Sequence, residues 1–356
     1  MARIRVLVVE DSLTVRGRLV EVFAMDPQFE IVGEAGDGKR AIELCKKLRP
    51  DVITLDMMLP IMTGVAVTEY IMAHFPTPIL IVSASTNRGE LYRTYDALAA
   101  GAVDVLEKPT GDEADGVWEK RFLSAVKLVS RIKVITHPRL RMGVLGRQAS
   151  SVLPEVFSPV STKCGVVVIG ASTGGPAAVV EVLRALPADY PIPVILVLHI
   201  GKLFGAAFAN WLDGQSAHHV SCARDGTALP KTGGVVMAPP DQHLVVQDGL
   251  LRLTDGPERH SCRPSVDVLF ESVAKSFGRS AAACLLTGMG RDGAKGLLDI
   301  RRAGGFTIAQ DEATSVIYGM PREAALLGAA ERVLALGEIG PALASLAAPS
   351  PGRRLK

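Results

Sequence analysis

The segment that most constrains this chain is a glycine-rich turn, Gly170–Pro176, with the sequence GASTGGP. The β-branched run before it, Val166–Ile169, predicts a buried parallel strand. The stretch after it, Ala177–Leu183, predicts a helix that has Pro176 in its first turn. In this context a Gly-x-Ser-x-Gly turn places its serine at the top of a sheet, beside backbone N–H groups that can hold an oxyanion. The segment therefore indicates a candidate nucleophile, Ser172.

The same turn has a second interpretation, because a glycine-rich connection also closes βαβ units or binds a phosphate at a helix N-terminus. It has no Gly-Lys-Ser/Thr ending, which disfavours a nucleotide P-loop. The spacing of Gly170 and Gly174 does not fit a dinucleotide-binding fingerprint. From the motif alone, a catalytic serine and a structural turn are equally open.

The length of the chain, 356 residues, allows two domains of ordinary size. Its net charge of +2 gives no strong attraction to nucleic acid or to a membrane surface. The five cysteines include no Cys-x-x-Cys pair, so neither a disulfide framework nor a zinc site is indicated. The apolar run at the N-terminus is too short for a signal peptide, and no run reaches membrane-spanning length. We expect a cytoplasmic protein that does not insert into the membrane.

The N-terminal half alternates predicted strands with helical stretches such as Ser12–Met25 and Gly38–Leu48. This alternation is typical of a parallel sheet whose ligands bind at the carboxyl ends of the strands. The predicted strands are Ile4–Val9, Val52–Leu55, Ile79–Val82 and Val103–Leu106. The polar residues that follow them are Glu10, Asp11, Asp56, Ser83 and Lys108.

Three carboxylates gathered at one edge repel each other unless a cation lies between them. Oxygen ligands suit Mg²⁺, so Glu10, Asp11 and Asp56 are candidate metal ligands. Asp56 is also a candidate nucleophile toward a phosphoryl group, whose oxygens Ser83 and Lys108 are placed to hold. The alternative is that each acid is an ordinary solvated residue at a strand end.

These residues make positions 1–133 resemble a two-component receiver domain, which has a flavodoxin-like doubly wound parallel sheet. The resemblance implies that a histidine kinase supplies phosphate to Asp56 and that Mg²⁺ binds with Glu10, Asp11 and Asp56. Two positions depart from the commonest pattern. Glu10 replaces a more frequent Asp, and Val105 stands where many receivers have a Tyr or Phe that switches conformation.

Beyond the receiver, helical spacing continues over Trp118–Val134, and residues 134–163 are predicted to be a linker rich in Pro, Ser, Gly and Arg. We expect a second domain over residues 164–345 and a short basic tail over 346–356.

Two more predicted strands of the C-terminal half end beside chemically useful residues. Val194–Leu198 ends at His199, and Ala281–Leu286 leads into a glycine-rich loop that contains Asp292. Serine needs an adjacent base, histidine is the usual base near neutral pH, and a carboxylate fixes the tautomer of the imidazole. We therefore predict that Ser172, His199 and Asp292 meet at one edge of a doubly wound sheet.

Other residues compete for two of these roles. His243 and His260, both expected in loops, are second-rank candidates for the base, and Asp241 and Asp311 are rivals of Asp292. The order Ser, His, Asp also differs from the order Ser, acid, His of the α/β-hydrolases. A separate doubly wound hydrolase is indicated.

Residues 164 to about 340 resemble the catalytic domain of the chemotaxis protein-glutamate methylesterases, the CheB family. The segments that carry the resemblance are Ile169–Pro176, Arg263–Phe270, Leu286–Gly293, Thr307–Glu312 and Gly319–Arg322. The resemblance implies Ser172 as nucleophile, His199 as base and Asp292 as its orienting acid. It also implies the Met289 backbone N–H in the oxyanion site, with Thr173 flanking the nucleophile.

The family's activity implies a phosphorylation-activated hydrolase that demethylates glutamate methyl esters on chemoreceptors, releases methanol and deamidates particular receptor glutamines. No metal or other cofactor is expected in the esterase site. Family members usually have Gln before the histidine and Met-Pro followed by Gly-Phe after it. Here Leu198 precedes His199 and Ile200–Phe204 follows it, so the rim of the site differs.

A second class of function stays open: a response regulator whose second domain only binds a partner when Asp56 is phosphorylated. DNA is disfavoured as that partner, because the chain has neither a helix-turn-helix pattern nor a basic stripe.

Overall fold

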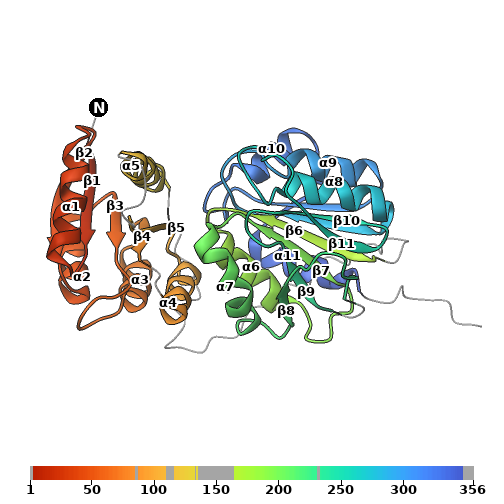
Figure 1. The fold of residues 1–356 in the computed structure, drawn as a ribbon, viewed down its shortest axis with the longest axis horizontal. Coiled ribbons are helices and arrows are strands. Elements are labelled where there is room, and N and C mark those ends of the chain that lie inside the picture. Colours follow the sequence, from red (N-terminus) through yellow and green to blue (C-terminus); the bar gives the residue numbers. More distant parts are fainter. Residues whose placement is uncertain are drawn as a thin grey trace, which may run out of the picture. The chain divides into compact units, whose positions relative to one another are not determined.

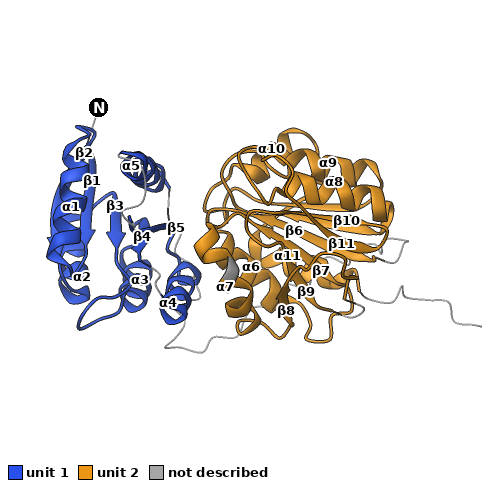
Figure 2. Ribbon diagram, viewed as in Figure 1, with its two compact units in different colours: residues 1–148 blue, residues 149–356 orange. Residues whose placement is uncertain are grey.

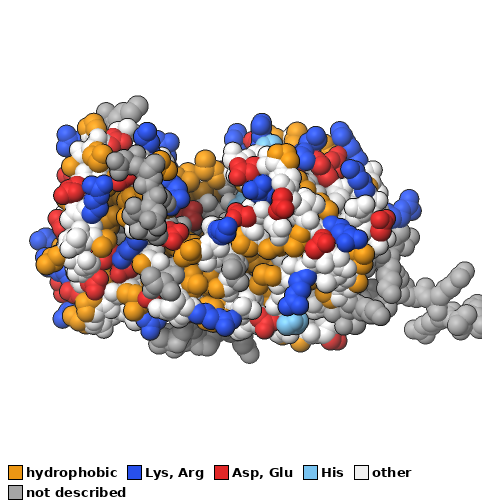
Figure 3. Space-filling view, viewed as in Figure 1, with side chains coloured by type: hydrophobic (Ala, Val, Ile, Leu, Met, Phe, Trp, Pro, Cys, Tyr) orange, Lys and Arg blue, Asp and Glu red, His pale blue; other side chains and the backbone are white. Residues whose placement is uncertain are grey.

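The computed structural model describes residues 3–84, 87–109, 116–132, 134, 164–230 and 233–347. The chain divides into two compact units, residues 1–148 and 149–356 (Figure 2). All but residue 134 of the predicted linker lies outside the described residues, as do positions 348–356 of the predicted tail. Figure 3 shows acidic and basic side chains interspersed over one face of each unit, as the small net charge leads one to expect.

The first unit is built on a sheet of parallel strands in the order β2-β1-β3-β4-β5 (Figure 1). This order confirms the flavodoxin-like fold. The strands are β1 (Ile4–Val9), β2 (Phe29–Ala35), β3 (Val52–Leu55), β4 (Ile79–Ser83) and β5 (Asp104–Glu107). The helices are α1 (Leu13–Ala24), α2 (Gly38–Leu48), α3 (Gly64–His74), α4 (Arg88–Ala99) and α5 (Val117–Val129).

Polar side chains start the first four of these helices, because each accepts a hydrogen bond from a backbone N–H three residues later. The capping residues are Ser12, Asp37, Thr63 and Asn87. The helix predicted over Trp118–Val134 is shorter than expected, since α5 ends at Val129. Just past that end, the Ser130 hydroxyl donates to the Lys127 carbonyl, 3.0 Å away, and satisfies an acceptor of the last turn.

The second unit contains a larger sheet in the order β14-β13-β12-β6-β7-β9-β8, with every pairing parallel. The strands are β6 (Val166–Ala171), β7 (Val194–Leu198), β8 (Val220–Cys222), β9 (Val235–Met237), β12 (Ala281–Leu285), β13 (Phe306–Gln310) and β14 (Arg332–Leu334). A separate antiparallel hairpin joins β10 (His243–Gln247) to β11 (Leu250–Thr254). The sequence pattern had not indicated this hairpin.

Helices cover both faces of this sheet, which makes the unit a doubly wound α/β domain (Figure 1). One face carries α8 (Val266–Phe277), α9 (Ala294–Arg302) and α10 (Met320–Leu326). The other carries α6 (Gly175–Ala185), α7 (Lys202–Asp213) and α11 (Leu336–Ser345). A short 3₁₀ turn, Gly278–Ser280, leads from α8 into β12.

The strand order reverses its direction beside β6, which comes first in the chain but lies in the middle of the sheet. From β6 the chain first adds β7 on one side and later β12 on the other. Such a point opens a crevice beyond the carboxyl ends of the strands, where ligands of these sheets bind. Ser172 immediately follows β6 and therefore stands at this crevice.

Candidate functional site

Ser172 is held at the end of β6 by contacts to the loop that follows β12. Its backbone N–H donates to the Thr287 carbonyl at 3.0 Å. A methyl group at Gly288 would lie 2.7 Å from Ser172 Cβ, so the backbone can approach the serine this closely only with glycine. Gly174, with φ of 76°, makes the left-handed turn into α6. The serine side chain is partly exposed, as an attacking hydroxyl must be.

His199 directly follows β7 and lies beside the serine turn. Its backbone N–H donates to the carbonyl of Ala171, the residue before Ser172, at 3.0 Å. Within the described part of the chain, no hydrogen bond joins the Ser172 hydroxyl to the His199 ring. The structure thus brings the two residues to adjacent strand ends without pairing their side chains.

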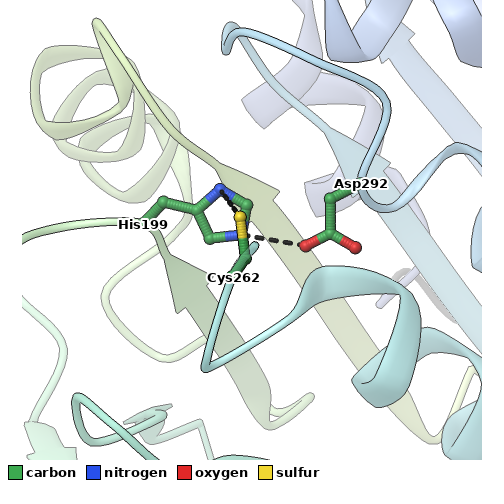
Figure 4. A group of neighbouring side chains, drawn as sticks. All are labelled: His199, Cys262 and Asp292. Atoms are coloured by element: carbon green, nitrogen blue, oxygen red, sulfur yellow. Dashed lines mark hydrogen bonds and ion pairs between the residues drawn. The ribbon is translucent and has the colours of Figure 1, made fainter. Parts of the chain in front are cut away.

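His199 and Asp292 are hydrogen-bonded, with 2.9 Å between Nε2 and Oδ2 (Figure 4). The histidine side chain is 13% exposed and the aspartate side chain 2% exposed. Because Nε2 faces the carboxylate, Nδ1 is the ring nitrogen left for proton transfer. Nδ1 lies 3.6 Å from the Sγ atom of Cys262.

The Asp292 carboxylate is seated on the N-terminus of α8. Its oxygens accept hydrogen bonds from Ser265 Oγ at 2.7 Å, Val266 N at 2.7 Å and Asp267 N at 3.0 Å. Helix N-termini favour negative charge. Burial alone would raise the pKa of Asp292, but its hydrogen bond with His199, the charge of that ring and the Ser265 hydroxyl lower it. The carboxylate is therefore ionised and fixed in orientation.

The pKa of His199 is raised to about 9. Burial by itself would lower it, and the hydrogen bond to Asp292, the contact with Cys262 and the negative charge of Asp292 outweigh that effect. The ring is therefore a stronger base than an exposed imidazole.

Asp267, in the first turn of α8, resembles Asp292 in that its carboxylate also accepts a hydrogen bond from the N-terminal part of a helix. It is fully buried, and its carboxylate accepts from the Gly296 N–H of α9 at 2.7 Å and bonds His260 Nε2 at 3.1 Å. Asp292 precedes α9 but binds the start of α8, whereas Asp267 belongs to α8 and binds the start of α9. These hydrogen bonds fix α8 and α9 relative to each other. They therefore also fix the position of Asp292, the acid of the candidate site.

Of the residues expected at the oxyanion site, Thr173 follows Ser172 in the chain, and Met289 follows Gly288, whose backbone packs against Ser172. Thr287 donates its hydroxyl to the Thr173 carbonyl at 3.0 Å and accepts from Ile317 N at 2.9 Å. The Met289 side chain is 56% exposed. In the described ranges no acceptor is bonded to the Met289 backbone N–H, which leaves it free for an oxyanion.

The rival residues are engaged elsewhere. His243 was expected in a loop but begins β10, where it is buried with Nδ1 accepting from Ser265 N and Nε2 facing the Pro257 carbonyl. His260 bonds Asp267 and Arg291. Asp241 pairs with Lys202 at 2.9 Å, and Asp311 accepts from Thr314 N at 3.0 Å. Of the three candidate acids, only Asp292 is hydrogen-bonded to His199 in the described part of the chain.

The first unit gathers its predicted polar residues at the carboxyl edge of its sheet. Oxygen atoms of Glu10, Asp11 and Asp56 lie within 4.8 Å of one another. Glu10 and Asp56 are buried, whereas Asp11 is exposed. Three carboxylates from the ends of neighbouring strands are a donor set that fits a hard divalent cation.

Lys108 completes this second site. Its Nζ lies 2.8 Å from Glu10 Oε2 and 3.1 Å from Asp56 Oδ1. Burial alone would lower the pKa of Lys108, but its contacts with Glu10 and Asp56 outweigh that effect and raise it. The pKa of Glu10 is raised by burial. Ser83 is the buried last residue of β4, and its carbonyl accepts from Lys108 N at 2.9 Å. Val105 lies in β5, where it pairs with Ile81 of β4.

Comparisons with known proteins identify the family of each unit. A family model described as CheB methylesterase matches residues 167–343, and one described as response regulator receiver domain matches residues 6–115. The protein-glutamate methylesterase/protein-glutamine glutaminase 2 of Anaeromyxobacter dehalogenans is 44% identical over 96% of this chain and 97% of its own. This chain belongs to the CheB methylesterase family.

A second family relative, protein-glutamate methylesterase/protein-glutamine glutaminase 2 of Pseudomonas aeruginosa, is 43% identical over 97% of each chain. A crystal structure of the Thermotoga maritima CheB methylesterase catalytic domain matches with 35% identity and a TM-score of 0.49. It covers 52% of this chain and all of that one. No helix in the described part of this CheB family member is long and apolar enough to cross a membrane.

Sequence reasoning missed the residues that support the candidate site of this CheB family member. Ser265 lies in a segment that carried the resemblance, yet no role was assigned to it. Buried Gln310 accepts from Thr287 N at 2.8 Å and fixes the loop beside Ser172. Cys262 belongs to no Cys-x-x-Cys pair, so the sequence indicates no disulfide or zinc role for it. The available signal for Cys262 was that it immediately precedes Arg263–Phe270, a segment that carries the family resemblance.

Proposed function

We propose that this chain is a phosphorylation-controlled protein-glutamate methylesterase and protein-glutamine glutaminase that acts on chemoreceptors. The observation that carries the proposal is the His199–Asp292 pair, which stands one strand away from the serine turn at the crevice of the sheet. A binding module has no need of a buried carboxylate held by three donors against a histidine. The family relatives carry the same activity in their names.

In the proposed reaction Ser172 Oγ adds to the ester carbonyl while His199 accepts the hydroxyl proton at Nδ1. Asp292 holds Nε2 and stabilises the imidazolium. His199 then returns the proton to the departing methoxide, so methanol leaves and an acyl-enzyme remains. Water attacks the acyl group with the same base and releases the glutamate carboxylate. For a glutamine substrate the leaving group is ammonia.

The negative oxygen of the tetrahedral intermediate needs donors fixed in advance. We assign this role to the Met289 backbone N–H, with Thr173 flanking the nucleophile. The hydrogen bond between Thr287 and the Thr173 carbonyl supports the assignment, because it locks the two loops on either side of Ser172.

In the first unit we assign Asp56 as the acceptor of phosphate from a histidine kinase, with Ser83 and Lys108 holding the phosphoryl oxygens. Glu10, Asp11 and Asp56 would hold Mg²⁺, which when bound would screen the charge of the incoming phosphoryl group. Lys108 supports this assignment, since its ammonium group already lies 3.1 Å from Asp56. We place the protein in the cytoplasm, where such kinases and the receptor methylation sites are accessible.

We divide the chain into a receiver at residues 1–133, a linker at 134–163, a catalytic domain at 164–345 and a basic tail at 346–356. The boundary between the two compact units, after residue 148, falls inside this linker and supports the division.

The test is methanol release from a methylated chemoreceptor by the parent and by Ser172→Ala, with Ser276→Ala on α8 as a matched control. Removing a nucleophile of this kind costs about 10⁶ in rate. We expect the Ser172→Ala protein to be inactive and correctly folded, and the control to match the parent. An active Ser172→Ala protein would show that the chemistry lies elsewhere.

A further inference from the structure

Cys262 faces the nitrogen of His199 that the proposed reaction needs. Its Sγ lies 3.6 Å from Nδ1, and Nε2 of the same ring bonds Asp292 (Figure 4). The three side chains form a continuous Cys–His–Asp row, the arrangement that activates a cysteine nucleophile. By contrast, the candidate nucleophile Ser172 makes no hydrogen bond to the ring in the described structure.

The turn that carries Cys262 is firmly fixed. Arg259 and Cys262 exchange two backbone hydrogen bonds, of 3.1 and 2.9 Å, across His260 and Ser261, which both adopt left-handed conformations. The Arg259 guanidinium makes two hydrogen bonds to Glu271 on α8, of 2.8 and 2.6 Å. Asp267 holds His260 at 3.1 Å. These contacts keep the thiol against the His199 ring.

We propose that Cys262 is a covalent modification site for small disulfides, and that its modification stops the esterase. His199 Nδ1 removes the thiol proton, and the thiolate attacks one sulfur of the disulfide. A bond forms between Cys262 Sγ and that sulfur, the disulfide bond breaks, and the departing thiolate takes the proton from His199. The products are a mixed disulfide on Cys262 and one free small thiol. The loss of esterase activity rests on the function proposed above, whereas the thiol chemistry does not.

The chemistry favours Cys262 over Ser172 as the group that surrenders a proton, because a thiol is far more acidic than a serine hydroxyl. It also favours Cys262 over the other cysteines. Cys45 and Cys284 are buried. Burial raises the pKa of Cys164 to about 11 and also raises that of Cys222, and neither sulfur has a histidine partner among the described residues. Cys262 is partly exposed beside a base, as a reactive cysteine requires.

Modification would block catalysis directly. The added group would be bonded to an atom 3.6 Å from Nδ1 and would lie against the nitrogen that must accept the Ser172 proton. A reducing thiol would remove the group and restore the enzyme.

The experiment treats the full-length protein with 2,2′-dithiodipyridine at pH 9, where His199 Nδ1 becomes available as a base, and follows the released thiopyridone by absorbance. Methanol release is assayed before treatment, after it and after dithiothreitol. The variants are Cys262→Ser, Cys262→Ala and, as the matched control, Cys222→Ser. We expect one fast thiol, roughly tenfold or more ahead of the rest, in the parent and in Cys222→Ser. Its reaction should abolish methanol release, and dithiothreitol should restore it.

Both Cys262 variants should lose the fast phase, and each treated variant should keep its own untreated rate of methanol release. The proposal is overturned if the fast thiol persists without Cys262. It is also overturned if peptide mass analysis finds Cys262 modified while the parent stays active. His199→Gln should slow the fast phase, and Ser172→Ala should retain it. The rates of the fast phase in His199→Gln and Ser172→Ala are measured without esterase activity. They therefore test the thiol chemistry even if the proposed esterase function is wrong.

Discussion

At the scale of single residues, the two nitrogens of the His199 ring have different partners. Nε2 is hydrogen-bonded to Asp292, so only Nδ1 can act as the base, and it must be unprotonated to do so. The ring is protonated below its pKa of about 9 and becomes an available base as the pH rises through that value.

We therefore expect methanol release to increase between pH 7 and pH 9, by about tenfold per unit on the acid side. Asp292→Asn removes the main group that raises the pKa of His199, so its activity should begin to rise at a lower pH. Its maximum should fall by about 10⁴, because the amide favours the wrong tautomer. The check is a pH–rate profile of both proteins, with Asp241→Asn as control. An Asp292→Asn profile that coincides with the parent's would contradict this assignment.

We expect Ser265 to affect catalysis through its hydrogen bond to Asp292 and not through contact with the substrate. Ser265→Ala removes the hydroxyl that donates to Oδ1 at 2.7 Å. A hydrogen bond to a charged group contributes about 1.5–3 kcal/mol, so we expect kcat to fall by roughly 10–150-fold. The pH–rate profile should also move, since the pKa of Asp292 and hence of His199 changes. Ser265→Thr should restore much of the activity. Equal kcat and profile in Ser265→Ala and the parent would rule out this role.

At the scale of secondary structure, the candidate acid is positioned by an exchange between two helices. Each of α8 and α9 has N-terminal N–H groups that need acceptors, and each receives a carboxylate that belongs to the other helix or to the loop before it. A β-strand end alone would not hold Asp292 in one orientation.

The exchange makes Asp267 important for stability. Asp267→Ala leaves the Gly296 N–H and the His260 ring without their acceptor inside the protein. Leaving a buried donor unsatisfied costs about 1–3 kcal/mol, so we expect the free energy of unfolding to fall by that amount. Urea titrations would measure the change against Asp248→Asn, an exposed turn position that tolerates Asn. A loss no larger than in this control would mean that the exchange contributes little.

At the scale of the whole molecule, the proposed phosphorylation site and the proposed esterase site belong to different compact units. Phosphate on one can govern the other only through a coupling free energy between two arrangements of the chain. Typical couplings of about 1–3 kcal/mol correspond to roughly 5–150-fold changes in activity.

We expect a small phosphodonor with Mg²⁺ to activate methanol release by the parent within that range and to leave Asp56→Asn unactivated. Asp51→Asn is a matched control, because the Asp51 carboxylate accepts from the Arg5 N–H at 2.8 Å and takes no part in the proposed phosphorylation site. Phosphoprotein formation would be measured in the same samples. Activation of Asp56→Asn to the parent's level would show that phosphate acts at another residue.

Much of the fold could be predicted because its local patterns agree with its tertiary structure. Buried parallel strands are continuous apolar runs, and β1, β3 and β7 have the bounds that their runs predicted. The strand β2 was missed because Phe29–Ala35 mixes exposed and buried positions and includes two glutamates. The β10-β11 hairpin was missed because it packs beside the main sheet and follows no βα alternation.

The sequence by itself determined which residues follow which strands, and in a parallel sheet that is enough to place Ser172, His199 and Asp292 at one edge. It could not determine which ring nitrogen meets the acid, since that depends on side-chain directions set by packing. Nor could it bring Ser265 to Asp292 or Asp267 to Gly296, which meet because α8 and α9 lie side by side. The contact between Cys262 and His199 likewise depends on the turn before α8 meeting the end of β7. Hydrogen bonds of 2.7 to 3.6 Å between residues 25 to 93 positions apart are made by the folded chain, and no local pattern encodes them.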